Sequence, residues 1–229
     1  MPVRSLWSIV AAVLGVSTLV AQAPSPGRLE FTDPAGDVVP IEVSDGSKYP
    51  GFDVVKLVVE SGGGHLTVTA TLKSPPGPFA SDVVELYLDT DNSTKTGATL
   101  ANPELPGFEY RAQLDACVKF SDSSSTCAGG SATSAAKATA HYAIVRLDRF
   151  KGPKEFAGFD PIVDGLGFAP GGAAPQTDTT GAVVKATLDY GAVKVKAGRT
   201  IRVLARESAA GTSHGAVQGF FPEARLTLQ

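Results

Sequence analysis

The sequence has few of the residues on which common redox and zinc sites depend. Two cysteines, Cys117 and Cys127, and three histidines occur among its 229 residues. The cysteines lack the Cys-x-x-Cys spacing of a redox pair, and the histidines, His65, His141 and His214, are scattered singly. A structural zinc site needs four Cys or His ligands close together. The sequence therefore gives no support for thiol redox chemistry or zinc catalysis.

Clusters of basic residues are also lacking. The chain has 20 Lys and Arg against 23 Asp and Glu, which gives a formal net charge of −3. Nucleic acids and anionic membrane surfaces are recognised through basic patches. We therefore expect neither of them to be a partner of this protein.

An apolar run at the N-terminus predicts export. Arg4 precedes apolar residues 6–20, and Ala21-Gln22-Ala23 has the small-x-small pattern of a signal-peptidase site. The run is short for a membrane span, which needs about 20 apolar residues. We predict a signal peptide over 1–23, a single domain over 24–229 with no membrane attachment after cleavage, and a secreted or periplasmic location. In an exported protein, Cys117 and Cys127 are predicted to form a disulfide.

The rest of the chain predicts an all-β fold. Residues 65–72 alternate strictly between apolar and polar, and they follow residues 54–60 across a Gly-rich turn, which indicates a hairpin with one buried face. Further strands are predicted over 83–89, 108–114, 138–147, 182–190, 200–207 and 225–228. Many short strands joined by Gly- and Pro-rich loops predict an antiparallel β-sandwich with a jelly-roll-like or immunoglobulin-like path.

The segment 89–97, DTDNSTKTG, follows an apolar strand and predicts a calcium loop. Calcium prefers six to eight oxygen ligands, and a short loop of Asp, Asn and Thr closed by Gly can supply several of them. If strands 83–89 and 108–114 pair through their apolar faces, Glu109 lies near Asp89 and is a further candidate ligand. The predicted ligands are Asp89, Asp91, Asn92, Thr94 and Glu109. An ordinary Asp-rich turn without a metal remains the alternative.

Two other patterns carry a catalytic alternative. Residues 211–215, GTSHG, match the Gly-x-Ser-x-Gly form of a hydrolase nucleophile around Ser213, but no helix and no later His follow them. Asp160 and Asp164 could form the carboxylate pair of a glycosidase, although Asp before Pro and Asp before Gly are also common turn residues. We favour the turn interpretation for both aspartates, and an extracellular hydrolase is kept as the second hypothesis.

Several short motifs resemble those of family 9 carbohydrate-binding modules and DOMON-like domains. They are DPAGD at 33–37, LDTDN with TG at 88–97, GFEY at 107–110 and FFP at 220–222. The resemblance implies a calcium-bearing β-sandwich that binds a ligand without catalysis, here a glycan or a surface polymer. The single Trp and Met, Trp7 and Met1, lie in the predicted signal peptide. The mature chain therefore lacks a tryptophan for sugar stacking and a methionine for haem ligation.

Overall fold

The computed structural model describes residues 27–33, 41–42, 48–49, 53–74, 82–101, 104–124, 137–150, 163–168, 176–177, 182–208 and 217–229. Within these ranges the chain forms strands and turns. No helix in the described part of the chain is long and apolar enough to cross a membrane. The predicted signal peptide, 1–23, lies outside the described residues.

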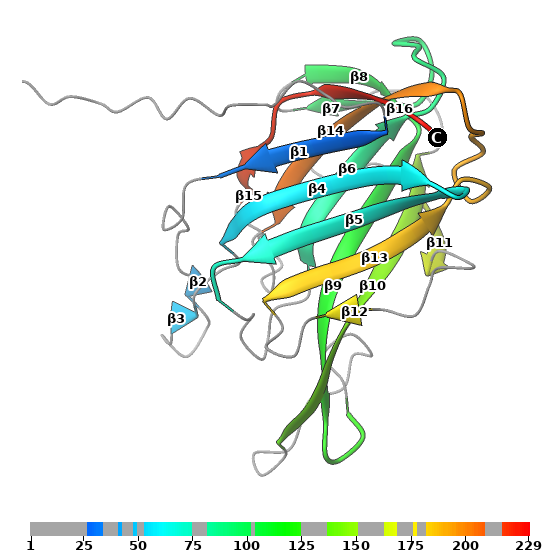
Figure 1. Cartoon of the computed structure of the whole chain (residues 1–229). Coiled ribbons are helices and arrows are strands. Elements are labelled where there is room, and N and C mark those ends of the chain that lie inside the picture. Colours follow the sequence, from blue (N-terminus) through cyan, green and yellow to red (C-terminus); the bar gives the residue numbers. More distant parts are fainter. Residues whose placement is uncertain are drawn as a thin grey trace, which may run out of the picture.

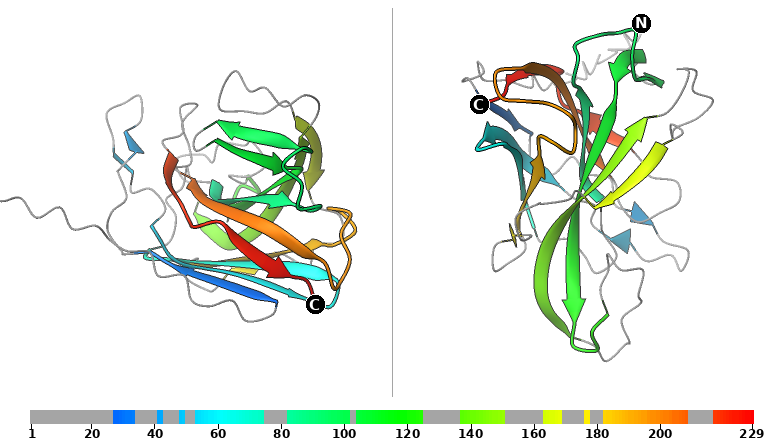
Figure 2. Two further views of the ribbon diagram at one scale, coloured as in Figure 1. Left: turned by 90° about the horizontal axis from the view of Figure 1, so that it is seen from above. Right: turned by 90° about the vertical axis from the view of Figure 1, so that its right-hand side faces the viewer.

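Two antiparallel sheets pack face to face, which confirms the predicted β-sandwich (Figures 1 and 2). The smaller sheet has the spatial order β1 (Arg28–Thr32), β4 (Val54–Gly62), β5 (His65–Leu72), β13 (Val183–Asp189), β12 (Gln176–Thr177). The larger sheet has the order β11 (Val163–Phe168), β10 (Ala138–Phe150), β9 (Tyr110–Phe120), β6 (Asp82–Asp89), β14 (Thr200–Ser208), β15 (Val217–Phe220), and β16 (Ala224–Thr227) also pairs with β14. Two small hairpins join β2 (Ile41–Glu42) to β3 (Lys48–Tyr49) and β7 (Ala98–Ala101) to β8 (Glu104–Phe108).

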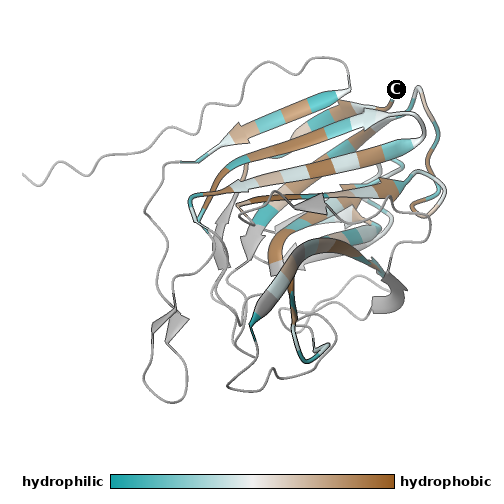
Figure 3. Ribbon diagram, turned by 60° about the horizontal axis from the view of Figure 1, so that its bottom comes forward, coloured by the Kyte–Doolittle hydropathy of each residue, from teal (hydrophilic) through white to brown (hydrophobic). Residues whose placement is uncertain are grey.

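Alternating side chains build the core between the sheets. In β5 the apolar residues Leu66, Val68, Ala70 and Leu72 are buried, and the polar residues between them are half-buried. Figure 3 shows such alternation as bands of high and low hydropathy along the strands. The core draws on both sheets, with Leu57 and Val68 from the smaller sheet and Leu86, Val145 and Val203 from the larger one. Burial of such side chains stabilises a fold by about 1.5–3 kcal/mol each relative to exposure.

The predicted pairing of the strands over 83–89 and 108–114 is confirmed as the pairing of β6 with β9. Leu88 lies opposite Tyr110, and Leu86 lies opposite Ala112, so the apolar faces of β6 and β9 coincide. The sequence predicted one continuous strand over 108–114, with Phe108 and Tyr110 two residues apart and so on the same face, and this was wrong. The chain leaves the strand at Glu109, so Phe108 ends β8 and lies against Tyr87 and Arg202, whereas Tyr110 enters the core.

The outward face of the larger sheet carries a layer of buried and half-buried ionic groups. Glu85 accepts hydrogen bonds from Tyr87 Oη at 2.7 Å and from Arg206, and it lies 3.5 Å from Arg111 Nη1. Arg111 in turn donates two hydrogen bonds to Asp148, at 3.0 and 2.7 Å. Burial raises the pKa of Tyr87. The polar face of β6 is thus as buried as its apolar face, which alternation alone does not predict.

The far ends of β9 and β10 form a ribbon that extends beyond the sheet (Figures 1 and 2). Within the described ranges, β6 pairs with β9 only up to Asp115, and β11 pairs with β10 only from Arg146 onwards. Cys117 is buried in this ribbon opposite Tyr142. Cys127 lies outside the described residues, so the disulfide stays a prediction.

The first and last described segments meet at one hydroxyl group. Ser61, at the end of β4, lies with its Oγ 3.2 Å from both the Gly27 and the Thr227 carbonyl oxygens. The backbone N–H of Gln229 donates to the same Oγ at 3.2 Å. This hydroxyl therefore connects the segment before β1 to the segment after β16 on one side of the sandwich.

Candidate metal site

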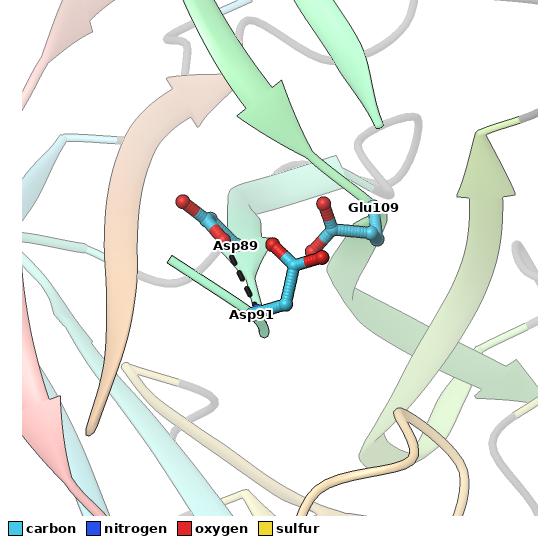
Figure 4. Close-up of side chains that lie close together, drawn as sticks. All are labelled: Asp89, Asp91 and Glu109. Atoms are coloured by element: carbon cyan, nitrogen blue, oxygen red, sulfur yellow. Dashed lines mark hydrogen bonds between the residues drawn. The ribbon is translucent and has the colours of Figure 1, made fainter. Parts of the chain in front are cut away.

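Three carboxylates meet where β6 ends and β9 begins. Asp89 is the last residue of β6, Asp91 follows in the loop, and Glu109 occupies the break between β8 and β9. One oxygen from each of the three lies within 4.8 Å of the others (Figure 4). The backbone holds the two chain segments together, because the Glu109 N–H donates to the Leu88 carbonyl at 3.0 Å. Asp89 is buried, Glu109 is half-buried and Asp91 is exposed, so the group opens towards solvent on one side.

Side-chain acceptors shape the loop that carries Asp91. Asp89 Oδ1 accepts the backbone N–H groups of Asp91 at 3.2 Å and Asn92 at 2.6 Å, which turns the chain at once after the strand. Asn92 has a positive φ of 58°, a conformation that Asn tolerates better than most residues. Asp91 accepts the Ser93 N–H at 2.9 Å and the Thr96 hydroxyl at 2.9 Å. The position of Asp91 is therefore set by short-range contacts within its own loop.

Two glycines allow this loop to lie directly on the β7–β8 hairpin. Gly97 has φ of 66°, and a Cβ at this position would overlap the Phe108 carbonyl and reach within 2.8 Å of Glu109 Oε1. Gly107 has φ of 95°, and a Cβ there would overlap the Ser93 carbonyl oxygen. Side chains at either position would push the loop away from the hairpin and Asp91 away from Glu109.

Arg202, from β14, is the internal counter-ion of Asp89. The two residues are register partners on neighbouring strands, and the Arg202 Nε donates to Asp89 Oδ2. The same guanidinium donates to the Pro106 carbonyl at 2.6 Å, lies 3.4 Å from Glu223 and stacks 5.1 Å from the centre of the Phe108 ring. Arg202 therefore joins β14, β6 and β8 around the carboxylates.

Glu109 is the carboxylate of the three with an oxygen that accepts no hydrogen bond in the described structure. Its Oε2 accepts the backbone N–H of Thr90 at 2.7 Å and the Thr90 hydroxyl at 3.0 Å. Its Oε1 is buried and has no hydrogen-bond partner in the described structure. Burial, followed by the nearby charges of Asp91 and Asp89, raises the pKa of Glu109, although the Thr90 hydrogen bonds act in the opposite direction. A cation beside Oε1 would remove both the unmet hydrogen bond and the repulsion.

The donor set is suited to a hard cation. Carboxylate oxygens are the ligands that calcium and magnesium prefer, whereas zinc favours sulfur and nitrogen. No other group of three or more His, Cys, Asp or Glu side chains in the described residues lies close enough to hold a metal. Three carboxylates leave several positions of a calcium ion to waters or backbone carbonyls, which is common for calcium sites.

The sequence predicted five ligands, and the structure brings three of them together. The Asn92 side chain is turned elsewhere: it donates to the Thr200 carbonyl, and it accepts from Arg225 Nη1 at 3.1 Å. Thr94 is exposed in the turn of the loop. The hydroxyl that contacts Asp91 belongs instead to Thr96. The position of Thr96 directly before the Gly that closes the loop could have indicated this contact. Arg202 was missed, since it is 113 residues from Asp89 in the sequence.

The catalytic alternatives fall largely outside the described residues. Ser213, Asp160 and His214 all lie there. Asp164 is part of β11 and pairs with Arg149 of β10, so the prediction of a turn at this position was wrong. His65 Nδ1 lies 2.5 Å from Asp189 Oδ1 on the smaller sheet, and His141 lies in β10.

Comparison with known proteins identifies no relative: no protein-family model, no protein of curated function and no solved structure matches this chain. The described geometry thus supports an all-β sandwich with an acidic group that could hold a metal ion.

The raised pKa of Glu109 gives a pH-dependent prediction for Glu109→Gln in metal-free protein. Because the folded pKa lies above the unfolded one, ionised Glu109 destabilises the fold at pH values above the folded pKa, and this cost disappears as the pH falls. We expect the variant to be more stable than the wild type at neutral pH in EDTA, with the difference shrinking on acidification. Urea unfolding over a pH series measures this difference.

Glu30→Gln is the control of opposite sign. Hydrogen bonds from Lys56 and Arg28 lower the pKa of Glu30, so its contribution to stability is present above the unfolded pKa and is lost as the pH falls through the folded pKa. This variant should be less stable than the wild type at neutral pH and equal to it in acid. A Glu109→Gln curve that followed the Glu30→Gln curve would contradict the assigned environment of Glu109.

Proposed function

We propose that this protein is an exported, non-catalytic binding module in which one calcium ion, held by Asp89, Asp91 and Glu109, fixes the loop after β6 against the β7–β8 hairpin. The observation that carries the proposal is the approach of the three carboxylates to within 4.8 Å. The buried and unpartnered Oε1 of Glu109 supports it. The ion has a structural role here, and the ligand is a glycan or a surface polymer.

Export and ligand binding rest on the sequence. The N-terminal segment has the pattern of a signal peptide, and the loop and strand motifs resemble family 9 carbohydrate-binding modules and DOMON-like domains. Calcium sites of extracellular modules commonly bind in the ~10⁻⁴–10⁻³ M range, which the calcium outside a cell can fill. A site of this affinity would be filled after export and would complete the fold there.

Calcium addition is expected to raise the melting temperature of the mature protein. At a hundredfold excess over Kd, an ion that binds only the folded state adds about 2.7 kcal/mol. For a domain of this size each kcal/mol corresponds to roughly 2–4 °C, so the expected rise is about 5–10 °C relative to protein in EDTA. Differential scanning calorimetry in EDTA, calcium and magnesium measures this rise and the choice of ion.

Asp91→Asn provides the matched variant. Asp91 is exposed, and Asn retains one oxygen to accept the Ser93 N–H, so the metal-free variant should melt close to the metal-free wild type. The calcium-dependent rise should fall to a small fraction, because one charged ligand is lost. If several millimolar calcium does not change the melting temperature of the wild-type protein, the metal site is rejected, and Asp89 and Asp91 are ordinary turn residues.

A further inference from the structure

Two exposed arginines flank the acidic loop and have no acidic partner among the residues that the structure describes. Arg199 Nη2 donates to the Thr90 carbonyl at 3.4 Å, and Arg225 Nη1 donates to Asn92 Oδ1 at 3.1 Å. Thr90 and Asn92 are the neighbours of Asp91 on either side. Within the described residues neither arginine forms an ion pair, whereas Arg28, Arg111, Arg146, Arg202 and Arg206 all do.

Both arginines stand on well-anchored backbone. Arg199 directly precedes β14, and its carbonyl accepts the Leu228 N–H at 2.8 Å. Arg225 lies in β16 opposite Arg202. A guanidinium has five N–H donors, and each of these two uses one of them on a neutral oxygen. Each arginine therefore keeps an uncompensated charge and further donors in a fork suited to a carboxylate.

A bound calcium ion would make this end of the sandwich attractive to anions. Among the described residues, the carboxylates here are Asp89, Asp91 and Glu109, with Glu223 beside Arg202, and the cations of the loop and its contacts are Lys95, Arg199, Arg202 and Arg225. These two sets of described residues are equal in number, so their charges balance when no metal is bound. Adding a divalent ion leaves net positive charge beside two exposed guanidinium groups, which attracts anions over about a Debye length.

We propose that Arg199 and Arg225 form an anion-binding edge beside the calcium loop, and that the ligand of the module is a polysaccharide that carries carboxylate groups. This inference rests on the proposed function for the presence of the ion and of a polymer ligand. The overall charge of −3 argues against extended anionic surfaces such as a membrane or nucleic acid. A chain with spaced carboxylates needs only the local positive charge that this edge provides.

The test compares an oligogalacturonate, too short to gel with calcium, with its methyl ester, which has the same sugar chain without the charges. Isothermal titration of the mature protein in calcium should detect binding of the acid and at least tenfold weaker binding of the ester. Arg199→Gln and Arg225→Gln should each lower the affinity for the acid by roughly tenfold, the range of one charged hydrogen bond. Raising the salt concentration should weaken binding as well.

Lys185→Gln is the matched control, because Lys185 is exposed on β13 of the other sheet and the charge change is the same. It should bind the acid like the wild type. The inference is overturned if the acid and the ester bind equally, if neither binds, or if both arginine variants bind the acid like the wild type. It is also overturned if the protein binds phosphatidylserine vesicles through these arginines but does not bind the oligosaccharide.

Melting curves of the same samples separate the two proposals. A calcium-dependent rise in melting temperature without binding of the acid would reject the anion-binding edge and keep the calcium site. Binding of the acid that depends on both arginines, without any calcium effect, would reject the calcium site and would show that the two arginines bind the anion without the charge of an ion.

Discussion

Replacing Arg202 with Met is expected to destabilise the metal-free protein by about 3–5 kcal/mol, the usual cost of removing one partner of a buried ion pair. Asp89 has no exposed surface, and Arg202 supplies the positive charge beside it. The variant also loses the hydrogen bond to the Pro106 carbonyl and the contact with the Phe108 ring. Urea unfolding in EDTA measures the loss.

A double-mutant cycle tests whether Asp89 causes this loss. Asp89→Asn removes the charge that Arg202 compensates, so the double variant should be much less destabilised than the sum of the two single variants. Arg225 is exposed and lies on β16 opposite Arg202, so Arg225→Met is the matched control. It should lower the free energy of unfolding by less than about 1 kcal/mol. Additive single effects would show that Arg202 acts through packing alone.

The Arg202→Met variant also tests whether a metal ion binds near Asp89. A calcium ion in the group would place positive charge near Asp89 and would replace part of what Arg202 provides. The destabilisation by Arg202→Met should therefore be smaller in calcium than in EDTA. If Arg202→Met lowers stability equally in calcium and in EDTA, any bound ion lies too far from Asp89 to compensate its charge.

Gly97→Ala is expected to give the second large loss, about 2–5 kcal/mol. The residue has φ of 66°, and an alanine Cβ would overlap the Phe108 carbonyl and crowd Glu109. The loop must move away from the hairpin or distort it. We also expect the calcium-dependent rise in melting temperature to shrink, because this movement separates Asp91 from Glu109. Urea unfolding and calorimetry provide the two measurements.

Gly198→Ala separates backbone strain from overlap. Gly198 also has a positive φ, of 83°, but a Cβ there meets nothing within 4 Å. This control should lose only about 1–2 kcal/mol, the cost of the left-handed conformation for a residue with a Cβ. If Gly97→Ala lost no more than Gly198→Ala, the close approach of the loop to Phe108 would be unimportant for stability.

Local patterns in the sequence predict much of this fold. Alternation over residues 65–72 identified β5 and its buried face, and matching apolar faces identified the β6–β9 pair. That pairing brings Asp89 and Glu109 together where β6 ends and β9 begins. Two of the three clustered carboxylates were therefore predicted from strand register alone. The third, Asp91, followed from the composition of the loop.

The remaining features depend on irregularities and long-range contacts that such patterns do not encode. The break at Glu109 moves Phe108 from the core face to the outward face, and nothing in the alternation around it marks this shift. Arg202 reaches Asp89 only because β14 happens to be the other neighbour of β6. Asp164 lies in an edge strand although Asp-Gly usually marks a turn, because pairing with β10 outweighs the local preference.

The hydroxyl of Ser61 has a consequence for how this domain can be engineered. Since it contacts both Gly27 and Gln229, the first and last residues that the structure describes lie side by side. A linker of a few residues could close the chain into a ring, and new termini could then be opened at the exposed Gly63–Gly64 turn of the β4–β5 hairpin, giving a circular permutant with the same sheets. The domain is likewise suited to insertion into a surface loop of a host protein, where both connections would leave from one corner.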